Sequence, residues 1–132
     1  AHYISVLDHI EQQLVRNKVG HIRIDGSVTS LDRAAAVKQF QNDETVRVAV
    51  LSIKAAGTGL TLTAATTVVF AELDVTPGLH LQAEDRCHRI GQHHSVNIHY
   101  LVAKGTLDER VKRMIDRKLA VVGQTLDGTQ KR

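Results

Sequence analysis

Apolar residues recur along the chain with two different periods, one typical of helices and one of strands. Spacings of three and four residues predict a helix over residues 3–15, with apolar positions at Ile4, Leu7, Ile10 and Leu14. Short apolar runs predict four strands, at residues 21–24, 46–52, 67–71 and 95–102. The runs at 46–52 and 67–71 are nearly continuous, which is typical of strands buried on both faces.

Helices are also predicted between and after these strands, over residues 31–40, 77–88 and 106–119. Thr29 or Ser30 can cap the first of them, and Pro77 suits the first turn of the second. A glycine-bearing loop and a short helical turn separate the second and third strands. Because helices and strands alternate, the sequence predicts an α/β fold with a doubly wound parallel sheet flanked by helices.

Composition narrows the class of protein. A chain of 132 residues, 42% hydrophobic and 23% charged, is typical of one globular domain and not of a disordered segment. The single cysteine, Cys87, excludes an internal disulfide and a cysteine-rich zinc site. No apolar run approaches the roughly 20 residues of a membrane span. The net charge of +3 permits nucleic-acid binding without showing it. The chain opens at Ala1 without a methionine, and we expect it to be a piece of a longer protein.

Ligands of parallel sheets bind at the carboxyl ends of the strands, which directs attention to the segments after Ile24, Ser52 and Ala71. The loop after the second strand carries Gly57 and Gly59, which allow positive φ and a close approach of backbone N–H groups to a phosphate. No Gly-Lys-Ser/Thr follows, and Leu62 stands where a dinucleotide fingerprint needs its third glycine. A tight turn without a ligand explains this loop equally well.

Two other segments, one at the end of a predicted helix and one after the first strand, also permit phosphate contacts. Arg86 and Arg89 are three residues apart, so on a helix they project to one side and together suit a phosphate. The alternative is a solvated face on which Glu84 and Asp85 pair with the arginines. Ser27 lies in a strand-to-helix connection whose hydroxyls and free N–H groups suit a nucleic-acid phosphate, or simply cap the helix. The spacing of the histidines does not favour a metal site.

In this order, the three segments resemble the motifs of a known family. Residues 24–27 are similar to the fourth motif, residues 52–62 to the fifth, and residues 82–92 to the sixth motif of superfamily-two helicase-type ATPases. The chain resembles their second RecA-like lobe, in particular that of the Swi/Snf DNA translocases, from Ala1 to about residue 119. Residues 95–106 and Thr61 resemble the annealing-helicase branch, which rewinds DNA and remodels stalled forks.

The resemblance implies roles for the residues that match the motifs. Arg86 and Arg89 are expected to contact the γ-phosphate of ATP, with Gln82 orienting their helix and with Gly57 and Gly59 allowing close approach at the cleft between two lobes. ATP and Mg²⁺ are expected in the full-length protein, held mainly by a first lobe whose motifs these residues lack. The isolated chain is therefore predicted to be inactive, with no cofactor or metal of its own.

The resemblance also implies partners and boundaries. Ser27, Ser52 and Lys54 are expected to contact DNA phosphates without regard to sequence. The other partner is the N-terminal RecA-like lobe of the same protein, in a nuclear, monomeric enzyme of DNA repair with no membrane association. The motor lobe is expected over residues 1–122, without the strand that precedes it in the family, followed by a flexible tail over 123–132.

Two other interpretations stay open. Family members carry an aromatic pair with tryptophan before the proline that matches Pro77, whereas Asp74, Val75 and Thr76 precede it here. This departure supports a catalytically inactive nucleic-acid- or protein-binding module of the same fold. A stand-alone nucleotide-binding or regulatory domain would require the match over residues 82–92 to be accidental.

Overall fold

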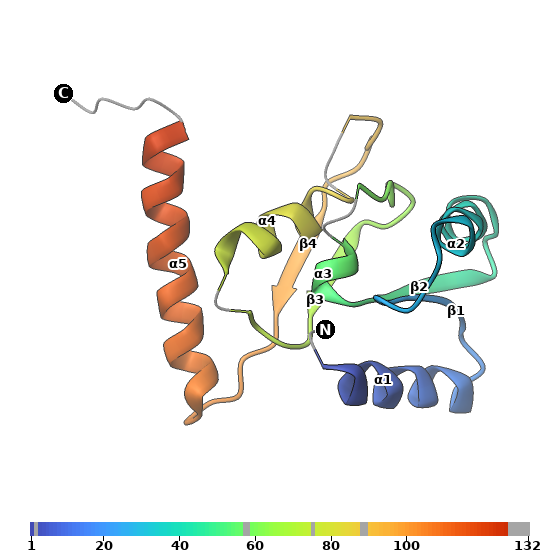
Figure 1. Ribbon diagram of the computed structural model, residues 1–132, viewed down its shortest axis with the longest axis horizontal. Coiled ribbons are helices and arrows are strands. Elements are labelled where there is room, and N and C mark those ends of the chain that lie inside the picture. Colours follow the sequence, from blue (N-terminus) through green and yellow to red (C-terminus); the bar gives the residue numbers. More distant parts are fainter. Residues whose placement is uncertain (2, 57–58, 75, 88–89, 127–132) are drawn as a thin grey trace.

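The structure, a computed structural model, describes residues 1, 3–56, 59–74, 76–87 and 90–126 (Figure 1). Helices and strands alternate along it as predicted. The helices are α1 (Ile4–Arg16), α2 (Ser30–Asn42), α3 (Ile53–Ala56), α4 (Pro77–Glu84) and α5 (Leu107–Leu126), and the strands are β1 (Gly20–Ile24), β2 (Val46–Leu51), β3 (Thr67–Phe70) and β4 (Asn97–Tyr100).

The strands pair in parallel, as a doubly wound fold requires, but they form two pairs rather than one continuous sheet. β1 pairs with β2 and β3 pairs with β4. A cavity of about 520 Å³ lies between β2 and β3, lined by apolar residues that include Val48, Val50, Val68 and Phe70. An interruption at the centre of the sheet therefore separates the two halves of the fold.

The backbone of Ala1 lies at this interruption. Its terminal amino group donates to the Leu51 carbonyl at 2.8 Å, and its carbonyl accepts from the Ile53 N–H at 2.8 Å. These two bonds straddle Ser52, which is the pattern of a residue in a parallel strand beside β2. The chain thus enters the structure in the position of a strand between β2 and β3.

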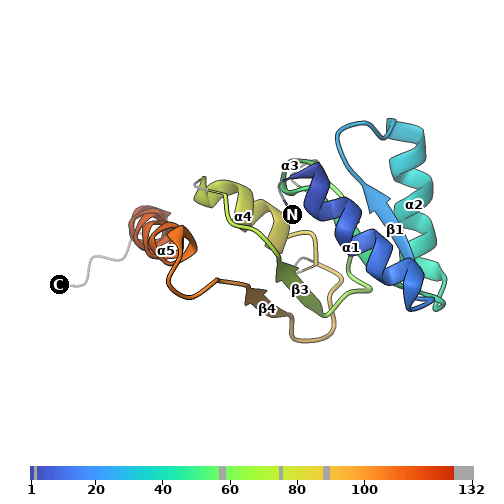
Figure 2. The ribbon, with the colours of Figure 1, turned by 90° about the horizontal axis from the view of Figure 1, so that it is seen from below.

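Helices cover the β1–β2 pair on both faces. α1 lies on one side of the pair and α2 on the other (Figures 1 and 2). Ile22 and Ile24 point toward α2, where they join Phe40 in the main core cluster, to which Leu62 and Cys87 also belong. α2 begins as predicted, because the Thr29 side chain accepts from the Asp32 N–H at its first turn.

The β3–β4 pair has a second, smaller cluster around Phe70. The Phe70 ring stacks on Tyr100 at 4.7 Å between centroids and meets the fully buried His80 edge-on at 4.9 Å. The prediction that β3 is buried on both faces is wrong, since Thr67 and Val69 alternate outward and Val69 is 52% exposed. Only the face with Val68 and Phe70 packs against the core.

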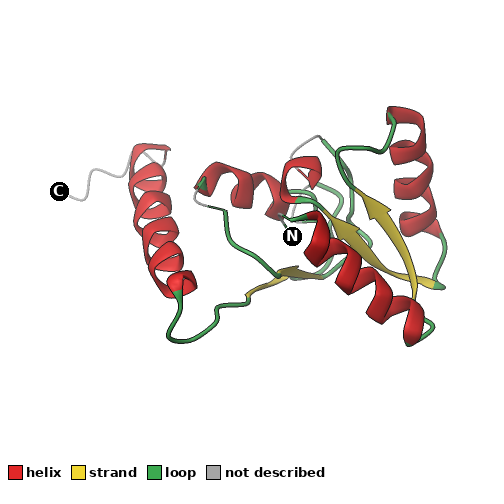
Figure 3. Ribbon diagram, turned by 60° about the horizontal axis from the view of Figure 1, so that its bottom comes forward, coloured by secondary structure: helices red, strands yellow, loops and turns green. Residues whose placement is uncertain are grey.

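Two predicted helix ends also differ from the structure. α4 ends at Glu84 instead of residue 88, because the N–H groups of Arg86 and Cys87 bond three residues back, to Ala83 and Glu84, and tighten the chain into turns. α5 continues to Leu126, past the predicted end at residue 119. It lies at the opposite end of the molecule from α2 (Figure 3).

Candidate nucleotide and nucleic-acid interface

The carboxyl ends of β1 and β2 lie side by side, so the segments that follow them meet. Ile24 is in register with Leu51, and the Ser52 N–H donates to the Ile24 carbonyl at 3.1 Å. This confirms the reasoning that parallel strands deliver the 25–27 and 52–54 segments to one edge of the sheet.

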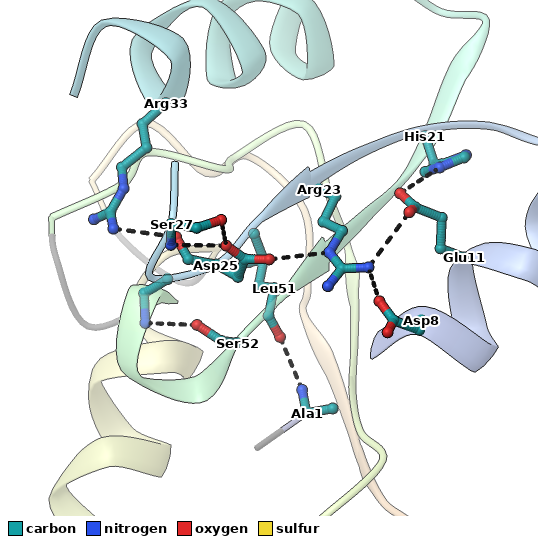
Figure 4. A network of polar contacts seen from close by, with 11 residues as sticks. Ala1, Asp8, Glu11, His21, Arg23, Asp25, Ser27, Arg33, Leu51 and Ser52 are labelled. Carbon is teal, nitrogen blue, oxygen red and sulfur yellow. Dashed lines mark hydrogen bonds and ion pairs between the residues drawn. The ribbon is translucent and has the colours of Figure 1, made fainter. Parts of the chain in front are cut away.

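Asp25 organises the loop after β1 (Figure 4). Its carboxylate is buried and accepts three hydrogen bonds: from the Ser27 N–H at 2.8 Å, the Ser27 hydroxyl at 2.5 Å and Arg23 Nε at 3.1 Å. The hydrogen bonds from Ser27, and then the Arg23 guanidinium, hold the pKa of Asp25 below its usual range. The carboxylate is therefore charged at neutral pH and fixes the backbone turn.

This turn changes what Ser27 offers to a ligand. The side chain is exposed, but its N–H and its hydroxyl proton are both donated to Asp25. A phosphate oxygen needs donors, so in this arrangement Ser27 presents oxygen lone pairs rather than protons. Contact with a DNA phosphate requires its hydroxyl to turn away from Asp25.

Arg23 links this loop to α1. Its guanidinium also pairs with Asp8 at 2.5 Å and with Glu11 at 3.4 Å, and the hydrogen bond to Asp8 is the main reason that its pKa is raised. Glu11 in turn bonds His21 Nε2 at 3.0 Å. No sequence motif pointed to this network, although alternation along β1 places His21 and Arg23 on the face opposite Ile22 and Ile24.

Ser52 and Lys54 follow β2, Ser52 just before the short helix α3 and Lys54 within it. The Ser52 hydroxyl oxygen accepts from the Ala55 N–H at 3.1 Å, which caps α3, and the residue is 9% exposed. Lys54 is exposed, as a phosphate-binding cation must be. Of the two glycines in the next loop, Gly57 lies outside the described residues.

Gly59 and Arg86 meet, although 27 positions separate them in the numbering. Gly59 has φ +85°, and a Cβ built on it would lie 3.9 Å from Arg86 Nη1. The Leu62 N–H donates to the Arg86 carbonyl at 2.8 Å, which joins the two segments directly. The glycine loop and the arginine segment therefore form one surface.

Arg86 does not project from a helix as predicted, because α4 ends before it. Its Nε donates to the Gln82 carbonyl at 2.8 Å, so Gln82 orients it through the backbone while its own side chain is exposed. Glu84 accepts from the Tyr100 hydroxyl instead of pairing with Arg86. Within the described part of the chain, no carboxylate pairs with Arg86, which disfavours the solvated ion-paired face. Arg89 lies outside that part.

Neither a metal-binding cluster nor a membrane-spanning helix is found among the residues that the structure describes. None of their His, Cys, Asp and Glu side chains gather in a group of three or more that could hold a metal ion. No helix among them has the length and apolarity to cross a membrane.

Comparison with known proteins decides the family. The sequence pattern described as "Helicase conserved C-terminal domain" matches residues 1–91. The chain belongs to this helicase C-terminal family. A crystal structure of the C-terminal part of the Fun30 ATPase domain shares its fold, with a TM-score of 0.82 and 33% identity over 86% of this chain and 36% of the other. The predicted α/β RecA-like lobe is thus confirmed.

Curated relatives confirm the narrower resemblance. The chain is 56% identical over its whole length to "DNA annealing helicase and endonuclease ZRANB3" of Bos taurus. It is 56% identical over 124 residues, 94% of its length, to a Xenopus tropicalis protein named "SWI/SNF-related matrix-associated actin-dependent regulator of chromatin subfamily A-like protein 1". The chain spans only 12% and 13% of the lengths of these two relatives.

Proposed function

We propose that this chain is the C-terminal motor lobe of a DNA-dependent ATPase that translocates on DNA, of the annealing-helicase or chromatin-remodelling type. In this role it supplies arginines to ATP bound against the N-terminal RecA-like lobe and grips the DNA backbone. One observation carries the proposal: Arg86 lies against Gly59, held by backbone and without a carboxylate partner in the described residues.

The arrangement of Arg86 suits charge neutralisation on a phosphoryl group. Its Nε is anchored on the Gln82 carbonyl, and its two terminal amino groups have no protein partner among the described residues. A guanidinium offers a planar pair of donors that matches two phosphoryl oxygens. Gly59 has no side chain, so a nucleotide phosphate could approach this guanidinium closely. Arg89 is proposed as the second arginine, and Gly57 as part of the same loop.

The described residues of the loop after β1 do not fit Mg²⁺. Mg²⁺ is held by carboxylates beside the substrate phosphates, and the carboxylate that this loop provides is that of Asp25. The Asp25 carboxylate is already used by Ser27 and Arg23. We therefore assign the metal of the ATP complex to residues of the partner lobe.

DNA contacts are proposed at the same edge of the sheet. Lys54 is exposed in the first turn of α3, which Ser52 caps, and Ser27 lies on the loop after the neighbouring strand β1. These groups contact phosphates and not base edges, so binding should be insensitive to sequence and fall steeply with salt. The names of the relatives, a DNA annealing helicase and a regulator of chromatin, support DNA as the partner and the nucleus as the location.

The boundaries of the lobe are also proposed. The two Ala1 backbone bonds and the apolar cavity between β2 and β3 support a strand preceding Ala1, which would join the two parallel pairs into one sheet. The lobe is proposed to run to residue 122, a boundary that falls within α5 because that helix continues to Leu126, and residues 123–132 are proposed as its tail. The alternative proposal is a catalytically inactive binding module of the same fold. Its only support is the departure from the family pattern at Val75, which lies outside the described residues.

The test compares arginine variants of the full-length protein. Arg86→Ala and Arg89→Ala should each reduce DNA-stimulated ATP turnover by about 10³-fold, the range known for catalytic arginines, with ATP affinity changed far less. Arg86→Lys should recover little, because an ammonium lacks the planar fork. Arg113→Ala, an exposed arginine of α5, is the matched control. Near-normal turnover in Arg86→Ala would refute the motor role.

A further inference from the structure

Two glutamines from different parts of the chain hold the loop that follows Gly59. Gln92 lies after α4, and its side-chain Nε2 donates to the carbonyls of Thr63 and Ala65, both at 2.9 Å, and of Cys87 at 3.2 Å. Its Oε1 accepts from the His94 N–H at 3.1 Å. One amide group thus holds together two loops and the turn that follows α4.

Gln41, at the end of α2, holds the same loop by different chemistry. Its Nε2 donates to the Thr63 hydroxyl at 2.9 Å, and its Oε1 accepts from the Ala64 N–H at 2.7 Å. A hydroxyl is both donor and acceptor, so the Gln41–Thr63 bond can reverse its direction. The three partners of Gln92 Nε2 are carbonyls, which can only accept.

The Gln92 contacts run parallel to the link between the glycine loop and Arg86. Cys87, one of its partners, directly follows Arg86, whose carbonyl accepts from the Leu62 N–H. Thr63, another partner, directly follows Leu62. The Gln92 amide and the Leu62–Arg86 hydrogen bond therefore join the same two segments at neighbouring positions. Together these hydrogen bonds set the distance between Gly59 and Arg86.

We infer that Gln92 is a positioning residue, which holds the glycine loop against the arginine segment without touching the nucleotide. The inference rests on the proposed ATPase function, because it concerns the alignment of Arg86. The Gln92 side chain makes hydrogen bonds to four backbone groups, so it has no donor left for a phosphate. Gln41 anchors the same loop to α2 and has no hydrogen bond to the described residues of the arginine segment, so its loss should leave Arg86 aligned.

The test makes one chemical change at both glutamines in the full-length protein. Gln92→Glu removes the donors and sets a carboxylate against three carbonyl oxygens, a repulsive contact. Gln41→Glu keeps an acceptor for the Ala64 N–H and can accept from the Thr63 hydroxyl, so its bonds survive. Gln92→Met removes the donors without adding charge, and it serves if Gln92→Glu fails to fold. Hydrogen exchange of peptide 60–66, ATP affinity and DNA-stimulated turnover are measured for each variant.

For Gln92→Glu or Gln92→Met we expect at least tenfold faster exchange in peptide 60–66 and at least a tenfold loss of kcat, with ATP affinity within about threefold of the parent. Gln41→Glu should stay within about threefold in every measurement. Equal losses at both positions, or unchanged exchange in both Gln92 variants, would overturn the inference. If the parent protein shows no DNA-stimulated turnover, the proposed function fails. The exchange comparison then still decides whether Gln92 holds the loop.

Discussion

The Asp25 turn gives the sharpest test of how this edge of the sheet is held together. Asp25→Asn keeps the shape of the side chain and an oxygen that can accept from the Ser27 N–H and hydroxyl. It removes the charge, and the amide nitrogen cannot accept from Arg23 Nε, which now donates at 3.1 Å. Arg23 keeps Asp8 and Glu11 as partners, so it is not left unpaired.

The size of the effect follows from these contacts. Hydrogen bonds to charged groups contribute about 1.5–3 kcal/mol each, and at Asp25 one is lost outright while two lose their charge assistance. Because Arg23 retains two carboxylates, a buried charge without a partner is avoided, and we expect a loss of about 2 kcal/mol. For a domain of this size that lowers Tm by roughly 5–8 °C.

Asp43 provides a matched control. Its carboxylate accepts from the Thr45 N–H at 2.9 Å and the Thr45 hydroxyl at 2.6 Å, the same turn chemistry as Asp25 with Ser27, but it is exposed and has no ion pair with an arginine in the described residues. In thermal and urea unfolding followed by circular dichroism, Asp25→Asn should cost clearly more stability than Asp43→Asn. Equal losses would refute the assignment of the difference to Arg23 and burial.

The pH dependence has a definite sign. The folded-state pKa of Asp25 is held below its ordinary value of 3.8, so its stabilisation is present above that value and is lost as pH falls through the lower folded value. The gap in unfolding free energy between the parent and Asp25→Asn should therefore be widest near neutral pH and shrink below about pH 4. A gap that stays constant down to pH 2 would contradict the charged role of Asp25.

Three further outcomes are expected. Burial raises the pKa of the Cys87 thiol from 9.0 to about 11, so iodoacetamide at pH 8 should modify it at least about 100-fold more slowly in the native chain than in urea. Gly59→Ala should lose about 1–2 kcal/mol of stability from its positive φ alone, whereas Gly78→Ala, in the first turn of α4, should gain about 0.5 kcal/mol. The isolated chain should neither hydrolyse ATP nor bind it tightly, and turnover that survives rigorous purification would contradict this.

Local sequence by itself determined the order of elements and the family. The apolar spacing of α1, the Thr29 cap of α2 and the apolar run of β2 act within a few residues, so the pattern predicted them directly. The helicase lobe was predicted from three motifs, at residues 24–27, 52–62 and 82–92, and the comparisons confirm it. Such motifs can be found in a sequence because their residues are constrained by the ligand that they contact. The meeting of the loops after β1 and β2 also followed, because parallel strands end at one edge.

Only the tertiary structure decided which partners the polar groups take. The sequence predicted that Ser27 contacts a DNA phosphate. In the fold, Arg23 links Asp25 to α1, and the Asp25 carboxylate accepts both hydrogen bonds that Ser27 can donate. Sequence put Arg86 in a helix, but turns after Glu84 direct it toward Gly59. Such outcomes depend on competition between donors and acceptors far apart in the chain, and a buried polar group accepts whichever partner the packing brings within reach.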